Sequence, residues 1–314
     1  MAELKPRATR EAYGDALKTL GERYENLFVL DADLSGSTKT SVFAKAYPER
    51  FINCGIAEGN MMSVAAGIAA AGNLVFASSF AMFAAGRAFE QIRNSIGYPH
   101  LNVKIGASHA GLSVGEDGAT HQCCEDIGVI RTIPGITIIN PCDYTEAYQA
   151  TIAAAAYKGP VYLRYGRLAA PVVCDENYTF EWGKGRTLRD GSDVTVVATG
   201  LMVGEALKAA DRLANEGVSV RVINIHTIKP IDKDILQKAA RETGVLVTSE
   251  EHNVIGGLGD AVLEAISEAP VPLVRHGVED KFGKSGAAWE VLKAYGLDEN
   301  GIYEKVKYAL TLKK

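Results

Sequence analysis

Residues 74–108, "LVFASSFAMFAAGRAFEQIRNSIGYPHLNVKIGAS", decide the fold class of this chain. The apolar run at 74–80 predicts a buried strand, the stretch at 84–97 predicts a helix, and 101–108 predicts a second strand. A strand, a helix and a strand in close succession are typical of a parallel sheet whose connecting helices cover its faces.

The same alternation continues on both sides of this stretch. Residues 10–24 predict a helix and 26–33 a buried strand, and a further helix is expected to begin near Ala57. Residues 171–192 are polar, contain Pro and Gly and show no periodicity, which is typical of a linker. We therefore expect an α/β fold of two open twisted sheets. The first, in residues 1–170, is mostly parallel and covered by helices on both faces, and the second is a smaller α/β domain in 193–314.

Length and charge exclude several classes of protein. The 314 residues are too many for one ordinary core and suggest two domains. A net charge of -5 leaves no basic surface for nucleic acid. The charged N-terminal sequence has no apolar segment of the secretory type. The five cysteines form no CxxC pair, which favours buried free thiols in a reducing compartment. We expect a cytoplasmic protein without a nucleic-acid partner.

One segment is long enough to raise the question of a membrane span. Residues 61–86 carry no charge. They are rich in Ala, Gly and Ser, however, and "AGN" at 71–73 is a break signal. The segment therefore predicts a helix, a turn, a short strand and the start of another helix, and no membrane contact.

The loop "GASHAGLSVGEDGATHQ" at 106–122 follows a predicted strand, where open α/β sheets bind ligands. A tight turn would explain its glycines and one acid, but not a histidine on either side. Imidazoles and a carboxylate can hydrogen-bond the hydroxyl and carbonyl groups of a polyol and move protons near neutral pH. We therefore consider His109, Asp117 and His121 to be candidate ligand-binding residues.

Glu58 stands where a predicted strand becomes a helix. An acid there can simply offset the positive end of the helix. The apolar and small residues that follow also favour a buried carboxyl, whose raised pKa would let it share a proton with a ligand nitrogen. Phe76, Phe80 and Phe83 either pack in the core or stack on a heteroaromatic ring.

The loop at 106–122 contains no Lys or Arg, so positive charge at the site must come from basic residues elsewhere in the chain. Arg164 and Arg167 lie at the end of a predicted strand, where they are either surface charges or a clamp for phosphate. Arg10 is a further candidate, and Ser37 could add a hydroxyl donor. The glycines at 254–266 predict a turn into a helix, because the full dinucleotide-binding pattern is absent. Three further histidines lack the spacing of metal ligands and are interpreted as structural. They are His226, His252 and His276.

Taken together, several segments resemble the C-terminal two domains of transketolase, a thiamine-diphosphate-dependent family. The resemblance runs from about residue 6 to the end and rests on "ATREAYGDAL", "CGIAEGNM", "SSFAMFAAGRAFEQIR", "GASHAGLSVGEDGATHQ", "YLRYGR", "TIKPID" and "GGLGDAV". It implies that Glu58 hydrogen-bonds the aminopyrimidine ring of the cofactor and promotes the imino form that deprotonates the thiazolium C2. It also implies that Phe80 and Phe83 pack around that pyrimidine.

The resemblance further implies a channel for sugar phosphates. His109 would lie in the channel as a catalytic residue and Asp117 would recognise a sugar hydroxyl. His121, a second catalytic candidate, falls where family members vary. The phosphate end of the channel would be formed by Arg10, Ser37 and Arg167.

One part of the family pattern is missing from this sequence. Transketolases hold the diphosphate through Mg²⁺ (or Ca²⁺) in a domain with a GDG…N motif, and no such segment precedes Arg10. The resemblance thus implies one subunit of a split transketolase of the pentose phosphate type, which transfers a two-carbon ketol unit from a ketose phosphate to an aldose phosphate. Its partner would be an N-terminal subunit that holds most of the metal site, in an α2β2 heterotetramer with self-association of this chain.

Three alternatives stay open at this point. The beta subunit of a thiamine-dependent 2-oxo-acid dehydrogenase shares the architecture and the need for another chain. Deoxyxylulose phosphate synthase shares segments similar to "GIAEGN" and "LRYGR". A non-catalytic scaffold subunit on the same fold is the alternative of another class.

Overall fold

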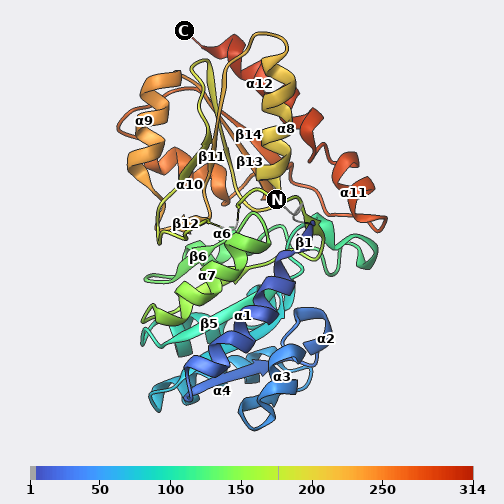
Figure 1. Cartoon of the computed structure of the whole chain (residues 1–314), viewed down its shortest axis with the longest axis vertical. Coiled ribbons are helices and arrows are strands. Elements are labelled where there is room, and N and C mark those ends of the chain that lie inside the picture. The colour runs from blue at the N-terminus through green and yellow to red at the C-terminus, as the bar shows by residue number, and fades with distance from the viewer. Residues whose placement is uncertain (1–4, 176, 314) are drawn as a thin grey trace.

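The computed structural model describes residues 5–175 and 177–313. Figure 1 shows two α/β layered units stacked along the long axis, with the first half of the chain below and the second half above. The predicted fold class is confirmed, because each unit contains an open, mostly parallel sheet with helices on both faces.

The first sheet has seven strands in the order β12-β6-β7-β5-β4-β2-β3. All neighbours in it run parallel except β12, which is antiparallel to β6. Its strands are β2 (Leu27–Asp31), β3 (Phe51–Asn53), β4 (Leu74–Phe80), β5 (Val103–Ser108), β6 (Thr137–Ile139), β7 (Val161–Arg164) and β12 (Thr227–Lys229).

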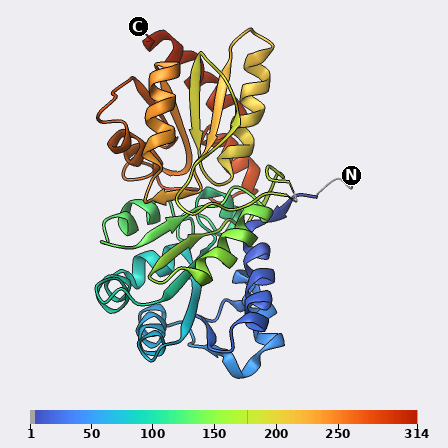
Figure 2. The same cartoon turned by 60° about the vertical axis from the view of Figure 1, so that its left-hand side comes forward.

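Two apolar cores, one on each face, hold this sheet between helices. One face packs against α1 (Thr9–Arg23), α3 (Ser41–Ala46) and α7 (Tyr144–Ala156). The other packs against α4 (Glu58–Ala70), the π-helical turns η2 (Met82–Arg87) and η3 (Ile92–Gly97), and α6 (Asp126–Arg131). Figure 2 shows α1 on one side of the sheet and the helices of the opposite face on the other side. The remaining short helical elements are α2 (Ser35–Thr38), η1 (Pro48–Arg50), α5 (Phe89–Gln91) and η4 (Leu112–Asp117). Strands β1 (Arg7–Ala8) and β8 (Ala169–Ala170) form a separate two-stranded antiparallel sheet.

The second sheet has five strands in the order β14-β13-β10-β11-β9, of which only the edge strand β9 is antiparallel. Helices α8 and α12 cover one face, and α9 and α10 cover the other. The elements of this unit are β9 (Arg186–Arg189), β10 (Val194–Ala198), α8 (Met202–Ala214), β11 (Val220–Asn224), α9 (Lys233–Thr243), β13 (Leu246–Asn253), α10 (Leu258–Ala265), β14 (Leu273–Val278), α11 (Ala288–Ala294) and α12 (Glu299–Leu312).

The structure differs from the sequence-based expectation in three places. The last part of the expected linker, 186–189, is strand β9 of the second sheet. Strand β12 comes from the second half of the chain but joins the edge of the first sheet beside β6. The expected helix at 84–97 is a succession of π-helical turns around the short α5. Wide π turns are frequent beside functional sites, and η2 lies beside the one described below.

The uncharged segment 61–86 folds as its sequence predicts. It contains most of α4, a turn at 71–72, strand β4 and the start of η2. Within 5–175 and 177–313, no helix is long and apolar enough to cross a bilayer. All five cysteines are free thiols, and only Cys54 is more than slightly exposed.

Candidate functional site

The candidate residues meet beyond the carboxyl ends of β4 and β5. These strands are adjacent and parallel, and Phe80 pairs in register with Ser108. The chain therefore leaves both strands at the same edge of the sheet and brings His109, the next residue, beside Phe80. Helix α4 begins with Glu58, so its N-terminus faces the same region. Parallel strand order thus assembles residues that are far apart in the sequence.

Glu58 is a buried carboxyl, with 3% of its surface exposed. Its Oε1 accepts a hydrogen bond from Ser79 Oγ at 3.3 Å, and its Oε2 accepts one from Arg87 Nη1 at 3.4 Å. Arg87 is itself 56% exposed, so the pair is open to solvent on one side only. The expectation that Glu58 is buried is confirmed, and its place in the first turn of α4 is compatible with the helix-end role as well.

Aromatic rings connect Glu58 to the loop. The Phe80 ring stacks on His109, with 3.8 Å between centroids, and lies 5.9 Å from the ring of Phe83. The Arg87 guanidinium lies 4.3 Å from the centroid of Phe83 and also contacts Glu58. His121 meets Phe83 edge to face at 5.3 Å. The rings and charges therefore form one contiguous cluster. Phe76, in contrast, is fully buried beside Tyr13 in the core.

His109 is held in a strained and fully paired position. Its φ of 56° lies in the left-handed region, which L side chains seldom adopt. Nδ1 lies 2.9 Å from Ser108 Oγ, and Nε2 lies 3.2 Å from Arg10 Nη1. Because Arg10 can only donate, Nε2 is the acceptor and the ring is neutral in this arrangement. Burial, followed by the charges of Arg10 and Arg167, lowers the pKa of His109 to about 3.

The lowered pKa of His109 predicts a specific loss of stability in acid. The unfolded chain takes up a proton on this ring near its ordinary value of 6.5, and the folded chain does so only near 3. The unfolded state therefore binds more protons between these values, and the free energy of unfolding falls as pH falls through this window. Denaturant titrations from pH 7 to pH 4 should show a shallower fall for His109→Asn than for the wild type. Equal slopes would contradict the assignment.

Arg10 and Ser37 form the basic side of the site. Arg10 Nη1 donates to the backbone carbonyl of Ser37 at 2.9 Å as well as contacting His109. Burial, then the nearby charge of Arg167, lowers the pKa of Arg10, so the two guanidinium groups repel one another here. Such a pair is stabilised when an anion comes between or beside them. Arg10 contacts the carbonyl of Ser37, and a role for the Ser37 hydroxyl as a donor to phosphate stays a prediction.

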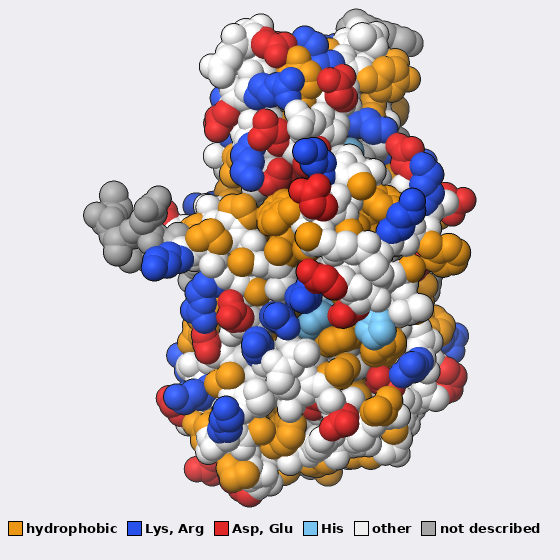
Figure 3. Space-filling view, turned by 90° about the vertical axis from the view of Figure 1, so that its right-hand side faces the viewer, with side chains coloured by type: hydrophobic (Ala, Val, Ile, Leu, Met, Phe, Trp, Pro, Cys, Tyr) orange, Lys and Arg blue, Asp and Glu red, His pale blue; other side chains and the backbone are white. Residues whose placement is uncertain are grey.

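The loop's other candidates lie farther out. Asp117 ends η4 and is exposed to solvent, and His121 Nδ1 lies 2.9 Å from Thr120 Oγ1. Arg167 Nη1 donates to the Val114 carbonyl at 2.7 Å and to Glu116 Oε2 at 2.5 Å. Arg167 therefore supports the loop in this state. Figure 3 shows histidine side chains beside basic and hydrophobic ones on the face of the molecule that is turned to the right in Figure 1.

Arg164 is a structural residue, and both readings considered from the sequence, a surface charge and a phosphate clamp, are wrong. Only 3% of it is exposed. Its Nε donates to Asp126 Oδ2 at 2.9 Å, and its Nη2 donates to the carbonyls of Cys123 and Glu251 at 3.3 and 2.9 Å. Although burial opposes the charge, Asp126 raises the pKa of Arg164. Its partners lie in both units, Asp126 and Cys123 in the first and Glu251 in the second. His252, interpreted from the sequence as structural, is buried, and its Nδ1 lies 2.7 Å from the Asn253 carbonyl.

Sequence reasoning missed two groups of residues at the site. Arg87 contacts both Glu58 and Phe83, and its only signal was a lone charge in the apolar stretch after β4. Gln122 and Glu251 contact the backbone of the loop. Glu251 lies 129 positions after Gln122 in the chain, and no local pattern links Glu251 to the loop.

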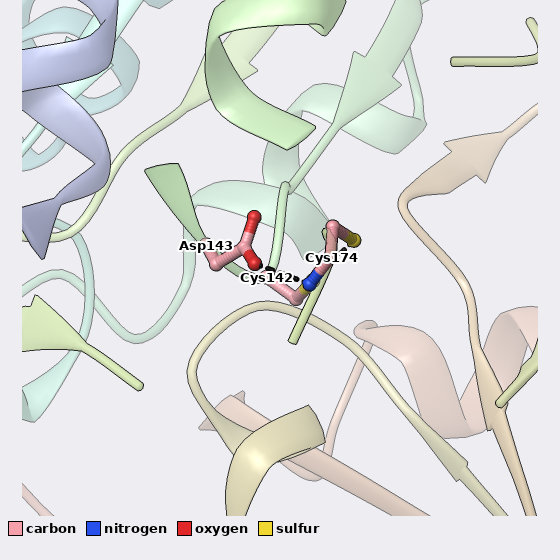
Figure 4. A group of neighbouring side chains, drawn as sticks. All are labelled: Cys142, Asp143 and Cys174. Atoms are coloured by element: carbon pink, nitrogen blue, oxygen red, sulfur yellow. Dashed lines mark hydrogen bonds between the residues drawn. The ribbon is translucent and has the colours of Figure 1, made fainter. Parts of the chain in front are cut away.

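A second polar cluster lies away from the site, at Cys142, Asp143 and Cys174 (Figure 4). The two sulfur atoms are 3.9 Å apart, and the three possible ligand atoms lie within 4.8 Å of one another. Asp143 Oδ1 accepts from the backbone N–H of Glu146 and caps α7, while Oδ2 accepts from the N–H groups of Val173 and Cys174. Since both carboxylate oxygens are engaged, the cluster is better explained as a helix cap that anchors the expected linker.

Family models match both halves of the chain. The model of the transketolase pyrimidine binding domain matches residues 5–172, and that of the transketolase C-terminal domain matches residues 183–302. Among individual proteins, the chain is 52% identical to a "Putative transketolase C-terminal section" of Methanocaldococcus jannaschii, over 95% of this chain and 94% of that protein. It is 42% identical to the 6-deoxy-6-sulfo-D-fructose transketolase subunit SqwH of a Clostridium species, over 92% and 90%.

Two further relatives differ in how much of their own length matches this chain. A structure described as a split gene transketolase, inactive beta4 tetramer, superposes with a TM-score of 0.92 at 52% identity and covers 98% of this chain and 99% of that one. Human transketolase is 37% identical over 97% of this chain, but the match covers only 49% of the human protein.

Proposed function

The chain belongs to the transketolase family, and from this premise we propose that it is the pyrimidine-binding subunit of a two-chain, thiamine-diphosphate-dependent transketolase. The reaction is the transfer of a two-carbon ketol unit from a ketose phosphate to an aldose phosphate. The observation that carries the proposal is the contiguous cluster that joins Glu58, Phe83, Phe80 and His109 at one edge of the first sheet.

The residues present fit the aminopyrimidine end of thiamine diphosphate. A flat heteroaromatic ring needs apolar faces and a carboxyl that shares a proton with a ring nitrogen. Phe80 and Phe83 offer the faces, and Glu58 offers a carboxyl that is buried yet held by only two long hydrogen bonds, at 3.3 and 3.4 Å. When bound, the cofactor supplies a nucleophilic carbon that accepts and releases the ketol unit. Glu58 would hold and move the proton at the ring nitrogen.

The other side of the cluster suits a sugar phosphate. Arg10 and Arg167 carry the positive charge that an anion such as phosphate would complement. Each also donates a hydrogen bond to a backbone carbonyl, which holds its guanidinium group in place. His109 is neutral and buried, and its two ring nitrogens face Ser108 and Arg10. A sugar hydroxyl or carbonyl that replaced one of these partners would be hydrogen-bonded without a change in charge. Asp117, exposed at the end of η4, would accept from a hydroxyl farther along the sugar.

A second chain would complete the site. Among the described residues of this site, none forms a ligand set for the magnesium ion through which the diphosphate would be bound. The match to only half of human transketolase supports a division of this kind. We propose a partner with the GDG…N motif in an α2β2 assembly.

Product analysis tests this function against the related thiamine enzymes. The chain and its partner subunit are mixed with thiamine diphosphate, Mg²⁺ and an aldose phosphate, and either a ketose phosphate or pyruvate is offered as donor. With the ketose phosphate as donor, we expect two products: an aldose phosphate two carbons shorter than the donor, and a ketose two carbons longer than the acceptor. We expect neither product with pyruvate as donor. Carbon dioxide released from pyruvate would contradict a transketolase and favour a 2-oxo-acid dehydrogenase or a deoxyxylulose phosphate synthase.

A further inference from the structure

A carboxylate of the second unit holds the backbone of the loop that follows β5. Glu251 lies on β13, is 4% exposed, and its Oε1 accepts a hydrogen bond from the backbone N–H of Ser113 at 2.5 Å. Ser113 belongs to η4, the element that ends with Asp117. Both partners are buried, so water competes little for this hydrogen bond. The second unit therefore contacts the candidate sugar loop directly.

Glu251 is itself fixed from behind. Its backbone carbonyl accepts from Arg164 Nη2 at 2.9 Å, and Arg164 is anchored by Asp126. Burial raises the pKa of Glu251, while Arg164 and the Ser113 N–H act in the opposite direction. The backbone of Glu251 on β13 is thus anchored by Arg164 of β7, and its carboxylate accepts the hydrogen bond from the Ser113 N–H of η4.

The loop backbone lies against this carboxylate with no room to spare. Gly111 adopts a φ of 81°, and a Cβ atom at this position would overlap the Glu251 side chain. A second contact holds the far end of the loop, where Gln122 Nε2 donates to the carbonyls of Leu112 and Lys284 at 3.2 and 2.9 Å. The conformation of 111–122 therefore depends on side chains and backbone of the second unit.

We propose that Glu251 is a positioning residue for sugar recognition. It fixes η4, and thereby sets where Asp117 stands relative to His109 at the start of the loop. It touches neither the Glu58 carboxyl nor the aromatic rings, so its effect is confined to the sugar side of the site. The inference rests on the proposed function for the identity of the ligand, but the contact between Glu251 and the loop is independent of it.

Three substitutions separate position from charge and from fold. Glu251→Ala removes the acceptor, and Glu251→Asp keeps the charge but withdraws it by one methylene. Glu251→Gln keeps an oxygen at the same distance and should restore much of the contact. The matched control is Glu264→Ala, because Glu264 on α10 also bridges the two units, through Arg131 at 2.7 Å, but is 69% exposed and remote from the loop.

Hydrogen exchange of the chain alone reads the loop without any assay of activity. In Glu251→Ala and Glu251→Asp, amides of 111–118 should exchange about 10-fold faster, while core amides of β4 and β10 stay protected. Glu251→Gln should lie near the wild type, and Glu264→Ala should match it. Unchanged loop exchange in the Ala and Asp variants, or equal acceleration throughout the chain, would overturn the proposal.

Kinetics of the reconstituted two-chain complex provide the second readout. Loosening the loop should raise the KM of the ketose phosphate about 10-fold in Glu251→Asp, leave kcat within about 3-fold, and leave the affinity for thiamine diphosphate unchanged. A fall in kcat with unchanged KM would overturn the positioning role. A wild-type complex without ketol transfer would refute the proposed function instead, and the exchange result would still decide whether Glu251 holds the loop.

Discussion

Replacement of Glu58 by Gln should lower turnover of the two-chain complex about 1,000-fold, within the range known for loss of a general acid–base group. The amide has the same shape and can still accept from Ser79, so the fold and the burial of the side chain should persist. It cannot take up and return a proton, however. The expected result is therefore a nearly inactive complex with a normal free energy of unfolding, measured by steady-state kinetics and urea titration.

The matched control for this variant is Glu49→Gln. Glu49 is 66% exposed and pairs only with its neighbour Arg50 among the ion pairs of the described residues, so the same loss of charge should leave kcat and KM unchanged. If Glu58→Gln retained turnover within a few-fold of the wild type, Glu58 would have no role in moving the proton.

The second large effect concerns the chain by itself. Without its partner, the chain should show no measurable ketol transfer and should bind thiamine diphosphate at least about 100-fold more weakly than the complex. The reason is that the cluster around Glu58 holds only the ring end of the cofactor, whereas the diphosphate and its magnesium ion contribute much of the binding free energy through charge. Isothermal titration with thiamine diphosphate and Mg²⁺, before and after addition of the partner subunit, measures this difference.

Two outcomes distinguish this account from others. Restored activity and tight binding on addition of the partner agree with a divided active site. Appreciable turnover by the purified chain alone would contradict the need for a second chain. Tight assembly with the partner but no cofactor binding in the complex would point to the scaffold role.

The sequence predicts the fold class because its periodicity is local. Apolar runs such as 74–80 form strands wherever a sheet is available, and the alternation with helices restricts the sheet to a parallel one. The family models confirm the resemblance to transketolase. The sequence could show this resemblance because each motif consists of contiguous residues. Strand β12 was not predictable in this way, because it pairs with β6 across the chain.

The same distinction applies to the site. The sequence singles out Glu58, His109 and Phe80 because Glu58 begins a helix, Phe80 ends a strand and His109 directly follows one. Arg164 has an equally promising position at a strand end, yet the side chain turns to Asp126 and the backbone of Glu251. Its orientation depends on packing between the two units, which no local pattern encodes.

A crystal structure of the reconstituted complex with thiamine diphosphate tests the central claim most directly. We predict that the aminopyrimidine ring packs against Phe80 and Phe83, that one of its ring nitrogens lies about 3 Å from the Glu58 carboxyl, and that the diphosphate is bound by the partner chain. A complex in which Glu58 faces bulk water and the ring lies elsewhere, out of contact with the loop of His109 and Asp117, would contradict the account.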